Sequence, residues 1–214
     1  MLRRICKYAA HLQLIRPMEL EVSLPKAIDK ISEPLSLEEQ QRLYQYVQAN
    51  PTPRKIGLLL GLELGLRIGE ICGLQWGDFD LKLGTLKISR TVCRIFCGNW
   101  HTKVVIQTPK TLTSRREIPI PKQLLMMLKK LRGNASNSTW FLSGNESKPT
   151  EPHCYRKSIK AYLKQATVRQ VHPHALRHTF ATTCLQAGCD VKTLSELLGH
   201  ANAKSPYSVM CTLT

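Results

Sequence analysis

The sequence predicts a mainly helical α+β fold with one small antiparallel β-sheet. In most of the chain, apolar residues recur at helical spacing between Pro and Gly breaks. Residues 76–121 differ, because short runs typical of strands alternate there with Gly or polar turns. The chain has 214 residues, of which 43% are hydrophobic, so it can bury a core as one domain or as a domain plus a fragment.

Two segments precede the main expected domain, which covers residues 35–200. In residues 1–16, Ile5, Tyr8 and Leu12 lie at helical spacing, and Pro17 ends the pattern. No capping residue precedes this helix, so we interpret residues 1–17 as the last helix of a larger unit. Residues 18–34 contain two prolines and mixed charges, which favours a linker.

The first two helices of the main domain have clear starts. Ser36, with Glu39 three positions later, forms a capping-box pattern for a helix that should run to about Asn50. Pro53 suits the first turn of the second helix. The apolar residues of this second helix lie nearly all round its axis, so we expect it to be central and buried.

The middle region should supply the sheet. Four short strands are expected, at residues 86–89, 92–96, 104–106 and 117–120. A helix at 123–131 should follow, and then a polar loop at 133–152 that contains a short apolar run.

Three helices should complete the domain. Residues 155–165 form a basic amphipathic pattern, and the next helix should cover 174–186 before Gly188 ends it. Asp190 is a suitable N-cap for a last helix to Leu198, which Gly199 should end. We find no internal repeat.

The charge of the chain favours a polyanionic partner. The formal net charge is +16 and the sequence pI is about 9.7, which predicts attraction to nucleic acid first and to acidic membrane surfaces second. A merely basic soluble protein is the plain alternative. No clean apolar run and cleavage site follow the basic start of the sequence, and no apolar stretch reaches 18 residues. We therefore expect no signal peptide, no membrane span and a cytoplasmic location.

The eight cysteines do not form a zinc-binding pattern. None belongs to a C-x-x-C pair, and the close pairs Cys93/Cys97 and Cys184/Cys189 lack the second pair that such a site needs nearby. We therefore expect free thiols in a reducing compartment, with no metal and no cofactor.

The most informative segment is the start of the helix expected at 174–186. His174 and Arg177 are three residues apart, which places them on one helical face. The imidazole can move or donate a proton, and the guanidinium can hold a phosphate through two parallel hydrogen bonds. Arg67 lies in a similar apolar setting, and His200 adds a second imidazole. Together these residues predict a site for a phosphodiester transition state.

Three ordered blocks carry a family resemblance. They are Gly-Leu-Arg-Ile-Gly-Glu-Ile at 65–71, Thr-Pro-Lys-Thr at 108–111 with Ser-Arg-Arg-Glu-Ile-Pro at 114–119, and His-Ala-Leu-Arg-His at 174–178 with Leu-Leu-Gly-His at 197–200. In this order and at these separations, the blocks resemble the catalytic domain of the tyrosine recombinase (phage integrase) family. The resemblance covers about residues 35–200, and it implies that residues 1–17 are the remnant last helix of a core-binding domain.

The resemblance implies a role for each matching residue. Arg67 and Arg177 would hold the nonbridging oxygens of the scissile phosphate, where negative charge spreads in phosphoryl transfer. Lys110 would protonate the leaving 5′ oxygen, and His174 would assist proton transfer. Glu70, one helical turn after Arg67, would orient this part of the site.

The resemblance also implies partners and an activity. His200 would donate a hydrogen bond to a phosphate oxygen. The expected function is site-specific recombination or integration of a mobile element by phosphodiester transesterification on double-stranded DNA. The expected assembly is a homotetrameric synapse, with no small-molecule substrate and no membrane partner.

The nucleophile of the family has no counterpart at the expected place. Family members carry a tyrosine nine or ten residues after the second His of the last block, where this chain has Val209 and Met210. The nearest phenol is Tyr207, in a segment (201–214) that departs from the family pattern. Tyr207 is therefore a candidate nucleophile that the resemblance does not support, and the chain is expected to be inactive or severely impaired.

A one-base shift would restore the family pattern. Reading from the last base of the Lys204 codon, the overlapping codons permit Ile-Thr-Leu-x-x-Tyr-Val-His, with the tyrosine ten residues after His200. The G of the Met210 codon joins the TG of Cys211 to encode the Val. Our hypothesis is a single-base deletion or sequencing error near Lys204; a genuinely divergent tail that uses Tyr207 is the rival.

Three other functions stay open. A non-catalytic DNA-binding protein could occupy recombination sites, and it would form no covalent adduct. A basic RNA- or ribosome-associated protein would leave the ordered Arg, Lys and His set unexplained. A type IB topoisomerase relative would share the chemistry, although the short chain and the Leu-Gly-His block favour an integrase.

Overall fold

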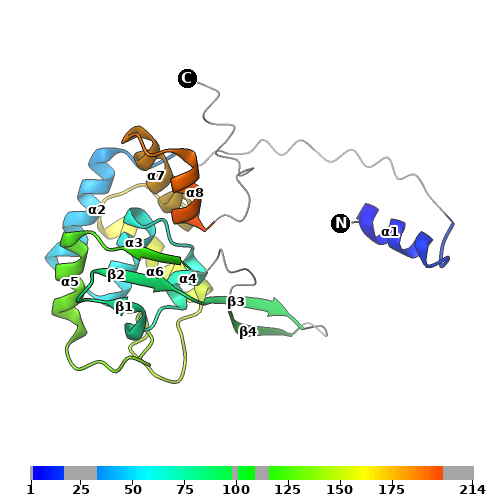
Figure 1. The fold of residues 1–214 in the computed structure, drawn as a ribbon, viewed down its shortest axis with the longest axis horizontal. Coiled ribbons are helices and arrows are strands. Elements are labelled where there is room, and N and C mark those ends of the chain that lie inside the picture. Colours follow the sequence, from blue (N-terminus) through cyan, green and yellow to red (C-terminus); the bar gives the residue numbers. More distant parts are fainter. Residues whose placement is uncertain (1, 17–32, 98–100, 109–115, 200–214) are drawn as a thin grey trace. The chain divides into compact units, whose positions relative to one another are not determined.

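A computed structural model of the chain describes residues 2–16, 33–97, 101–108 and 116–199 (Figure 1). The chain divides into two compact units, Met1–Ile31 and Ser32–Thr214. In the first unit, helix α1 covers Leu2–His11. It is shorter than the helix expected over 1–16, because the backbone turns at Gln13, whose φ is 58°.

Helices α2 (Leu37–Ala49) and α3 (Pro53–Glu63) begin as predicted. The Ser36 hydroxyl accepts a hydrogen bond from the Glu39 amide at 3.2 Å, and the Glu39 carboxylate accepts one from the Ser36 amide at 2.9 Å. This reciprocal pair is a capping box, so the prediction is confirmed. The predicted burial of the second helix is also confirmed, since Ile56, Gly57, Leu58, Leu59, Leu60, Gly61 and Leu62 are all buried.

The strands form two antiparallel sheets rather than one. The first contains β1 (Phe79–Asp80), β2 (Thr85–Ile88) and β5 (Arg116–Pro119), with β2 in the middle. The second is the hairpin of β3 (Thr91–Phe96) and β4 (Thr102–Gln107). All four expected strands are present. Strand β1 was not predicted, because its two residues are too few to show an alternating pattern.

Short helical segments and loops connect the sheets to the main core. Helix α4 covers Ile68–Cys72, and a 3-10 turn, η1, covers Trp76–Asp78. The apolar run in the loop after α5 (Lys122–Arg132) is buried. Its Phe141 ring lies 5.1 Å from the ring of Trp76 and 4.9 Å from that of Phe79, which ties the loop to the first sheet.

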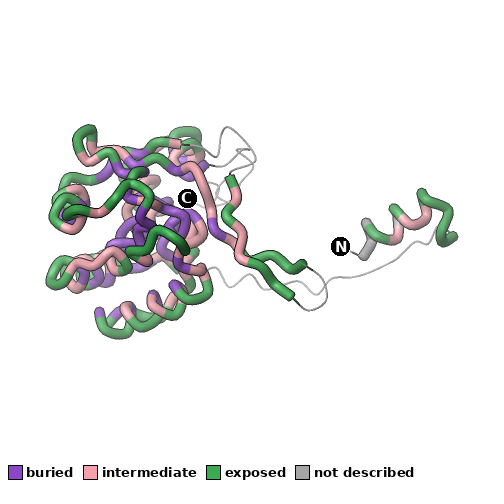
Figure 2. Tube along the Cα trace, turned by 90° about the horizontal axis from the view of Figure 1, so that it is seen from below, coloured by how far each residue is buried: buried purple, intermediate pink, exposed green. Residues whose placement is uncertain are grey.

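The last helices are α6 (Pro152–Gln165), α7 (Pro173–Gln186) and α8 (Val191–Leu198). As predicted, the Asp190 side chain caps α8 and Gly199 ends it, in the left-handed conformation at φ 65°. The main core surrounds α3, and a smaller cluster of Ala181, Leu194 and Leu198 joins α7 to α8. Burial decreases along the β3–β4 hairpin, whose outer half is exposed (Figure 2).

Candidate active site

The amino-terminal end of α7 presents His174. His172 is the N-cap and Pro173 is the first helical residue, an arrangement that the fixed φ of proline favours. The Nδ1 atom of His172 accepts a hydrogen bond from the His174 amide at 3.4 Å, and the two rings stack with centroids 5.5 Å apart. The His174 side chain is thereby held at the surface, at the positive end of the helix dipole.

Arg177, one turn further along α7, lies in the interior and is 4% exposed. Its Nη1 donates to the Gly65 carbonyl at 2.6 Å, and its Nη2 donates to the Leu198 carbonyl at 2.8 Å. Gly65 has φ 64°, and a Cβ there would lie 2.5 Å from the ring of Phe180. Only glycine therefore places this carbonyl against Arg177 without strain.

Arg67 comes from a different part of the chain and reaches the same acceptor. It is the N-cap of α4, and its side chain is 37% exposed. Its Nη1 donates to the Leu198 carbonyl at 3.4 Å, the same oxygen that accepts from Arg177. Leu198 is the last residue of α8, where the helix dipole is negative and favours cations. The end of α8 thus brings the two predicted arginines together.

Glu70 fixes Arg67 from the other side. Its carboxylate accepts from the Arg67 amide at 2.8 Å and from Arg67 Nη1 at 3.0 Å. The same carboxylate accepts a hydrogen bond from each terminal nitrogen of Arg116, both at 3.0 Å. The side chain of Arg116 is 7% exposed and that of Glu70 is 8% exposed. Glu70 therefore contacts Arg67 in the structure, and its expected role in orienting this part of the site stays a prediction.

Arg116 is the residue that sequence reasoning missed. It was part of the block at 114–119 but received no role. A signal was available, because alternate residues of a strand share a face and Ile118, two residues later, is buried. By that alternation Arg116 points inward, whereas Glu117 between them is exposed.

The surroundings favour the charged form of Glu70 and the neutral form of His174. Burial would raise the pKa of Glu70, but hydrogen bonds and charge from Arg116, with a further contribution from Arg67, outweigh it and lower the pKa. Partial burial lowers the pKa of His174, and the neighbouring His172 and Arg177 lower it further. A neutral imidazole at the surface can accept a proton.

Helix α6 adds positive charge beside this site. Its exposed lysines are Lys157, Lys160 and Lys164. Partial burial is the main cause of the lowered pKa of His172, and the charges of Arg156 and Lys160 lower it further. These α6 cations therefore lie near the start of α7. The basic amphipathic helix predicted here is confirmed.

The structure brings together three of the six predicted site residues: Arg67, His174 and Arg177. Their catalytic roles stay predictions. Lys110, His200 and Tyr207 lie outside the described residues. Within the described ranges, no group of three or more His, Cys, Asp or Glu side chains is placed to hold a metal ion, and no helix there has the length and apolar character needed to span a membrane.

Comparison with known proteins identifies the family of this fold. A Phage integrase family model matches residues 33–206. A "Tyrosine recombinase XerC-like" protein of Caldanaerobacter subterraneus subsp. tengcongensis is 33% identical over 162 residues, which are 67% of this chain and 41% of that protein. The "Transposase from transposon Tn916" of Enterococcus faecalis is 26% identical over 208 residues, 88% of this chain and 50% of that protein. The chain thus spans about half the length of the curated relatives it matches.

Solved structures share the fold. The integrase of transposon Tn1549, in complex with transposon right end DNA, superposes with a TM-score of 0.74 at 22% identity and covers 94% of this chain and 69% of that chain. A XerA recombinase structure has a TM-score of 0.63 at 22% identity and covers 98% of this chain and 72% of that chain. The sequence blocks, the fold and the family match agree, and the chain belongs to the phage integrase family.

Proposed function

We propose that this chain binds double-stranded DNA and holds one scissile phosphate between Arg67 and Arg177, in site-specific recombination of a mobile element. One observation carries the proposal: both guanidiniums bond the Leu198 carbonyl, at 3.4 Å and 2.8 Å. Two cations that converge on one backbone oxygen are placed to share one anionic ligand. Fixed guanidiniums stabilise the charge that develops on the nonbridging oxygens of a phosphate.

The proposed reaction is a transesterification. A tyrosine oxygen attacks the phosphorus, the bond to the 5′ oxygen breaks, and the DNA strand stays attached through a 3′-phosphotyrosyl bond. Lys110 gives a proton to the leaving 5′ oxygen. His174, whose pKa is lowered, takes the proton that the attacking tyrosine hydroxyl loses and can return it in the reverse step.

The same proposal includes the wider DNA contact. Arg156, Lys160 and the other exposed lysines of α6 would contact phosphates on either side of the site, so binding should weaken steeply with salt. The Tn1549 integrase structures are complexes with DNA, which supports DNA as the partner. Residues 35–200 would form the catalytic domain, residues 18–34 the linker and residues 1–17 the end of a DNA-binding unit, in a homotetrameric synapse.

A non-catalytic DNA-binding protein is the second candidate. The observation that favours it is the identity of Val209 and Met210 at the positions where the family has its tyrosine. In that case the arginine pair would still hold a phosphate, but no covalent intermediate would form. The two candidates therefore differ in one observable, the protein–DNA adduct.

A nicked duplex of the flanking attachment site tests both candidates. The chain as written, its Tyr207→Phe variant and a version with residues 205–214 in the shifted frame would be incubated with this duplex and separated on a denaturing gel. We expect an adduct only with the shifted-frame version. An adduct from the chain as written that disappears in Tyr207→Phe would make Tyr207 the nucleophile and end the frameshift hypothesis. Binding without any adduct would support the non-catalytic candidate.

A further inference from the structure

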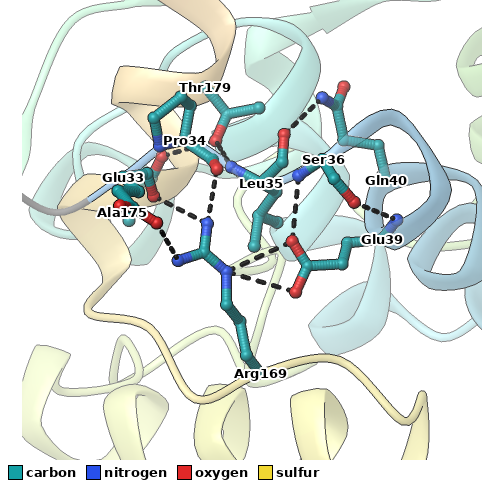
Figure 3. Close-up of polar contacts among 9 residues, drawn as sticks. All are labelled: Glu33, Pro34, Leu35, Ser36, Glu39, Gln40, Arg169, Ala175 and Thr179. Carbon is teal, nitrogen blue, oxygen red and sulfur yellow. Dashed lines mark hydrogen bonds and ion pairs between the residues drawn. The ribbon is translucent and has the colours of Figure 1, made fainter.

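A set of polar contacts joins the segment that leads into α2 to the helix that carries His174 and Arg177 (Figure 3). We call residues 33–35 the lead-in segment. We call its contacts with Arg169, Glu39 and Thr179 the clasp. The clasp lies outside the arginine pair and has no role in the proposed chemistry.

Arg169 is the centre of the clasp. Its Nε pairs with the Glu39 carboxylate at 3.2 Å, and its Nη2 donates to the carbonyls of Glu33, at 2.9 Å, and Pro34. Its Nη1 lies 3.7 Å from the Glu33 carboxylate. One planar guanidinium therefore holds both the start of α2 and the backbone of the lead-in segment, which a lysine could not do with the same geometry.

Helix α7 contacts the lead-in segment directly. The Leu35 amide donates to the Thr179 hydroxyl at 2.9 Å, and that hydroxyl donates to the Ala175 carbonyl at 2.8 Å. Leu35 and Thr179 are both buried, at 3% and 1% exposure. A buried amide must keep its acceptor, so any movement of Leu35 relative to α7 is costly.

The clasp is close in sequence to the residues that present the site. Arg169 is three residues before His172, the N-cap of α7, and Thr179 is two residues after Arg177. Gln170, next to Arg169, donates to the Lys160 carbonyl at 3.1 Å. The loop before α7 is thus tied to α6 on one side and to the lead-in segment on the other.

We propose that Arg169 is a positioning residue, which holds the start of α7 in register with the lead-in segment and so sets the place of His174 and Arg177. Because the lead-in segment includes Glu33 and Pro34, the last two residues of the expected linker, a displacement of the preceding chain would reach the phosphate site through the clasp. The inference rests on the proposed function only in assigning His174 and Arg177 to the reacting phosphate.

A titration of His174 by NMR in the full chain tests this positioning role without DNA. Partial burial is the main cause of the lowered pKa of His174, and the charged or titratable groups that lower it further are His172, Arg177, His178 and Arg67. If the clasp loosens, the start of α7 becomes more solvated, and the pKa of His174 should rise towards its ordinary value. His174→Gln would assign the resonance.

Two charge variants separate geometry from simple electrostatics. Removing a cation by Arg169→Gln would raise the pKa of a nearby imidazole, whereas removing an anion by Glu39→Ala would lower it, if charge alone mattered. The clasp predicts a rise in both. Thr179→Val, which changes no charge, should also raise the pKa, and Thr179→Ser, which keeps the hydroxyl, should retain the parent titration.

Arg90→Gln is the matched control. Arg90 also joins a carboxylate to a backbone carbonyl, with its Nη1 bonding Asp78 at 2.9 Å and the Gly73 carbonyl at 3.3 Å, but these acceptors lie outside α7 and the lead-in segment. We expect it to lower the melting temperature and leave the His174 titration unchanged.

The His174 pKa in these variants tests the positioning role of Arg169 independently of DNA binding. A higher His174 pKa in Arg169→Gln, Glu39→Ala and Thr179→Val supports it. Opposite shifts in the two charge variants, or a lower melting temperature with the parent titration, would overturn it and leave the clasp a purely structural contact. If a charge variant fails to fold, Thr179→Val against Thr179→Ser gives the decision. A chain that does not bind the nicked duplex would contradict the proposed function and leave this result intact.

Discussion

Glu39 and Glu70 occupy the same position in two helices, the third residue of α2 and of α4. Each carboxylate accepts a hydrogen bond from the backbone amide of its own N-cap residue, Ser36 or Arg67. Each also binds an arginine from a distant segment, which is Arg169 for Glu39 and Arg116 for Glu70. The burial of the two pairs differs. Arg116 and Glu70 are 7% and 8% exposed, whereas Arg169 and Glu39 are 39% and 12% exposed. One local capping device thus supports both a buried pair beside the phosphate site and a partly solvated pair at the lead-in segment.

From this difference we expect burial, and not the capping pattern, to set the contribution of each ion pair to the free energy of unfolding. A partly solvated ion pair is screened and contributes little, whereas breaking a buried pair leaves an uncompensated charge. The pair beside Arg67 should therefore dominate stability, and the pair at Arg169 should act mainly on position.

Arg116→Ala should have the largest effect. It leaves the Glu70 carboxylate buried with its main cation removed, so the free energy of unfolding should fall by about 3–5 kcal/mol. Urea denaturation at neutral pH measures this loss. A fall below about 1 kcal/mol, the size expected for a surface pair, would contradict the contrast between the two glutamates.

Glu63 extends the comparison of the two glutamates to a third one, which has no ion-pair partner among the described residues. Burial raises its pKa to about 7, so its stabilising contribution is complete below pH 4.5 and is lost as the pH rises through about 7. The change in the free energy of unfolding caused by Glu63→Gln should therefore be about 2 kcal/mol more favourable at pH 8.5 than at pH 5. Urea denaturation at the two pH values checks this, and an equal effect at both would contradict it.

Arg169→Gln should have a smaller effect on stability. Its guanidinium is partly exposed, so the loss should be about 1 kcal/mol, even though several acceptors lose a donor. The same denaturation experiment measures it. A loss equal to that of Arg116→Ala would mean that exposure does not separate the two pairs.

The smallest expected effect is on the acid side of the stability profile. Contacts with arginine and with the N-cap amides lower the pKa of both Glu39 and Glu70 below the ordinary value, despite burial. Each therefore contributes stability above its unfolded pKa and loses it as the pH falls through the folded value. Arg116→Ala should flatten the acid limb between pH 5 and 3 more than Arg169→Gln does. Equal flattening in the two variants would go against the comparison.

The helix starts could be predicted because their signals are local. Ser36 with Glu39, Pro53 and Asp190 each mark a start within a few residues, and the structure confirms all three. The first helix was predicted too long, because apolar spacing continues past the turn at Gln13. Strand β1 is too short for any period to show.

The candidate site was predictable in its residue types but not in its supports. Arg67, His174 and Arg177 follow from the sequence blocks. The Leu198 carbonyl that joins the arginines is a backbone atom 131 residues from Arg67 and 21 from Arg177, and no residue type signals such an acceptor. Arg169 could not be chosen among many cations, because its partners in the lead-in segment are also backbone carbonyls.

The central claim is that Arg67 and Arg177 hold one phosphate, and a binding cycle with a modified duplex tests it most directly. A single neutral methylphosphonate would replace the scissile phosphate in the nicked attachment-site duplex. Binding would be compared between the chain and Arg67→Gln, because a side chain that is 37% exposed should be replaceable without unfolding. We predict that the methylphosphonate weakens binding by the chain at least tenfold, about 1.4 kcal/mol, and has little further effect on Arg67→Gln. Equal weakening in both proteins would show that Arg67 does not contact that phosphate and would contradict the account.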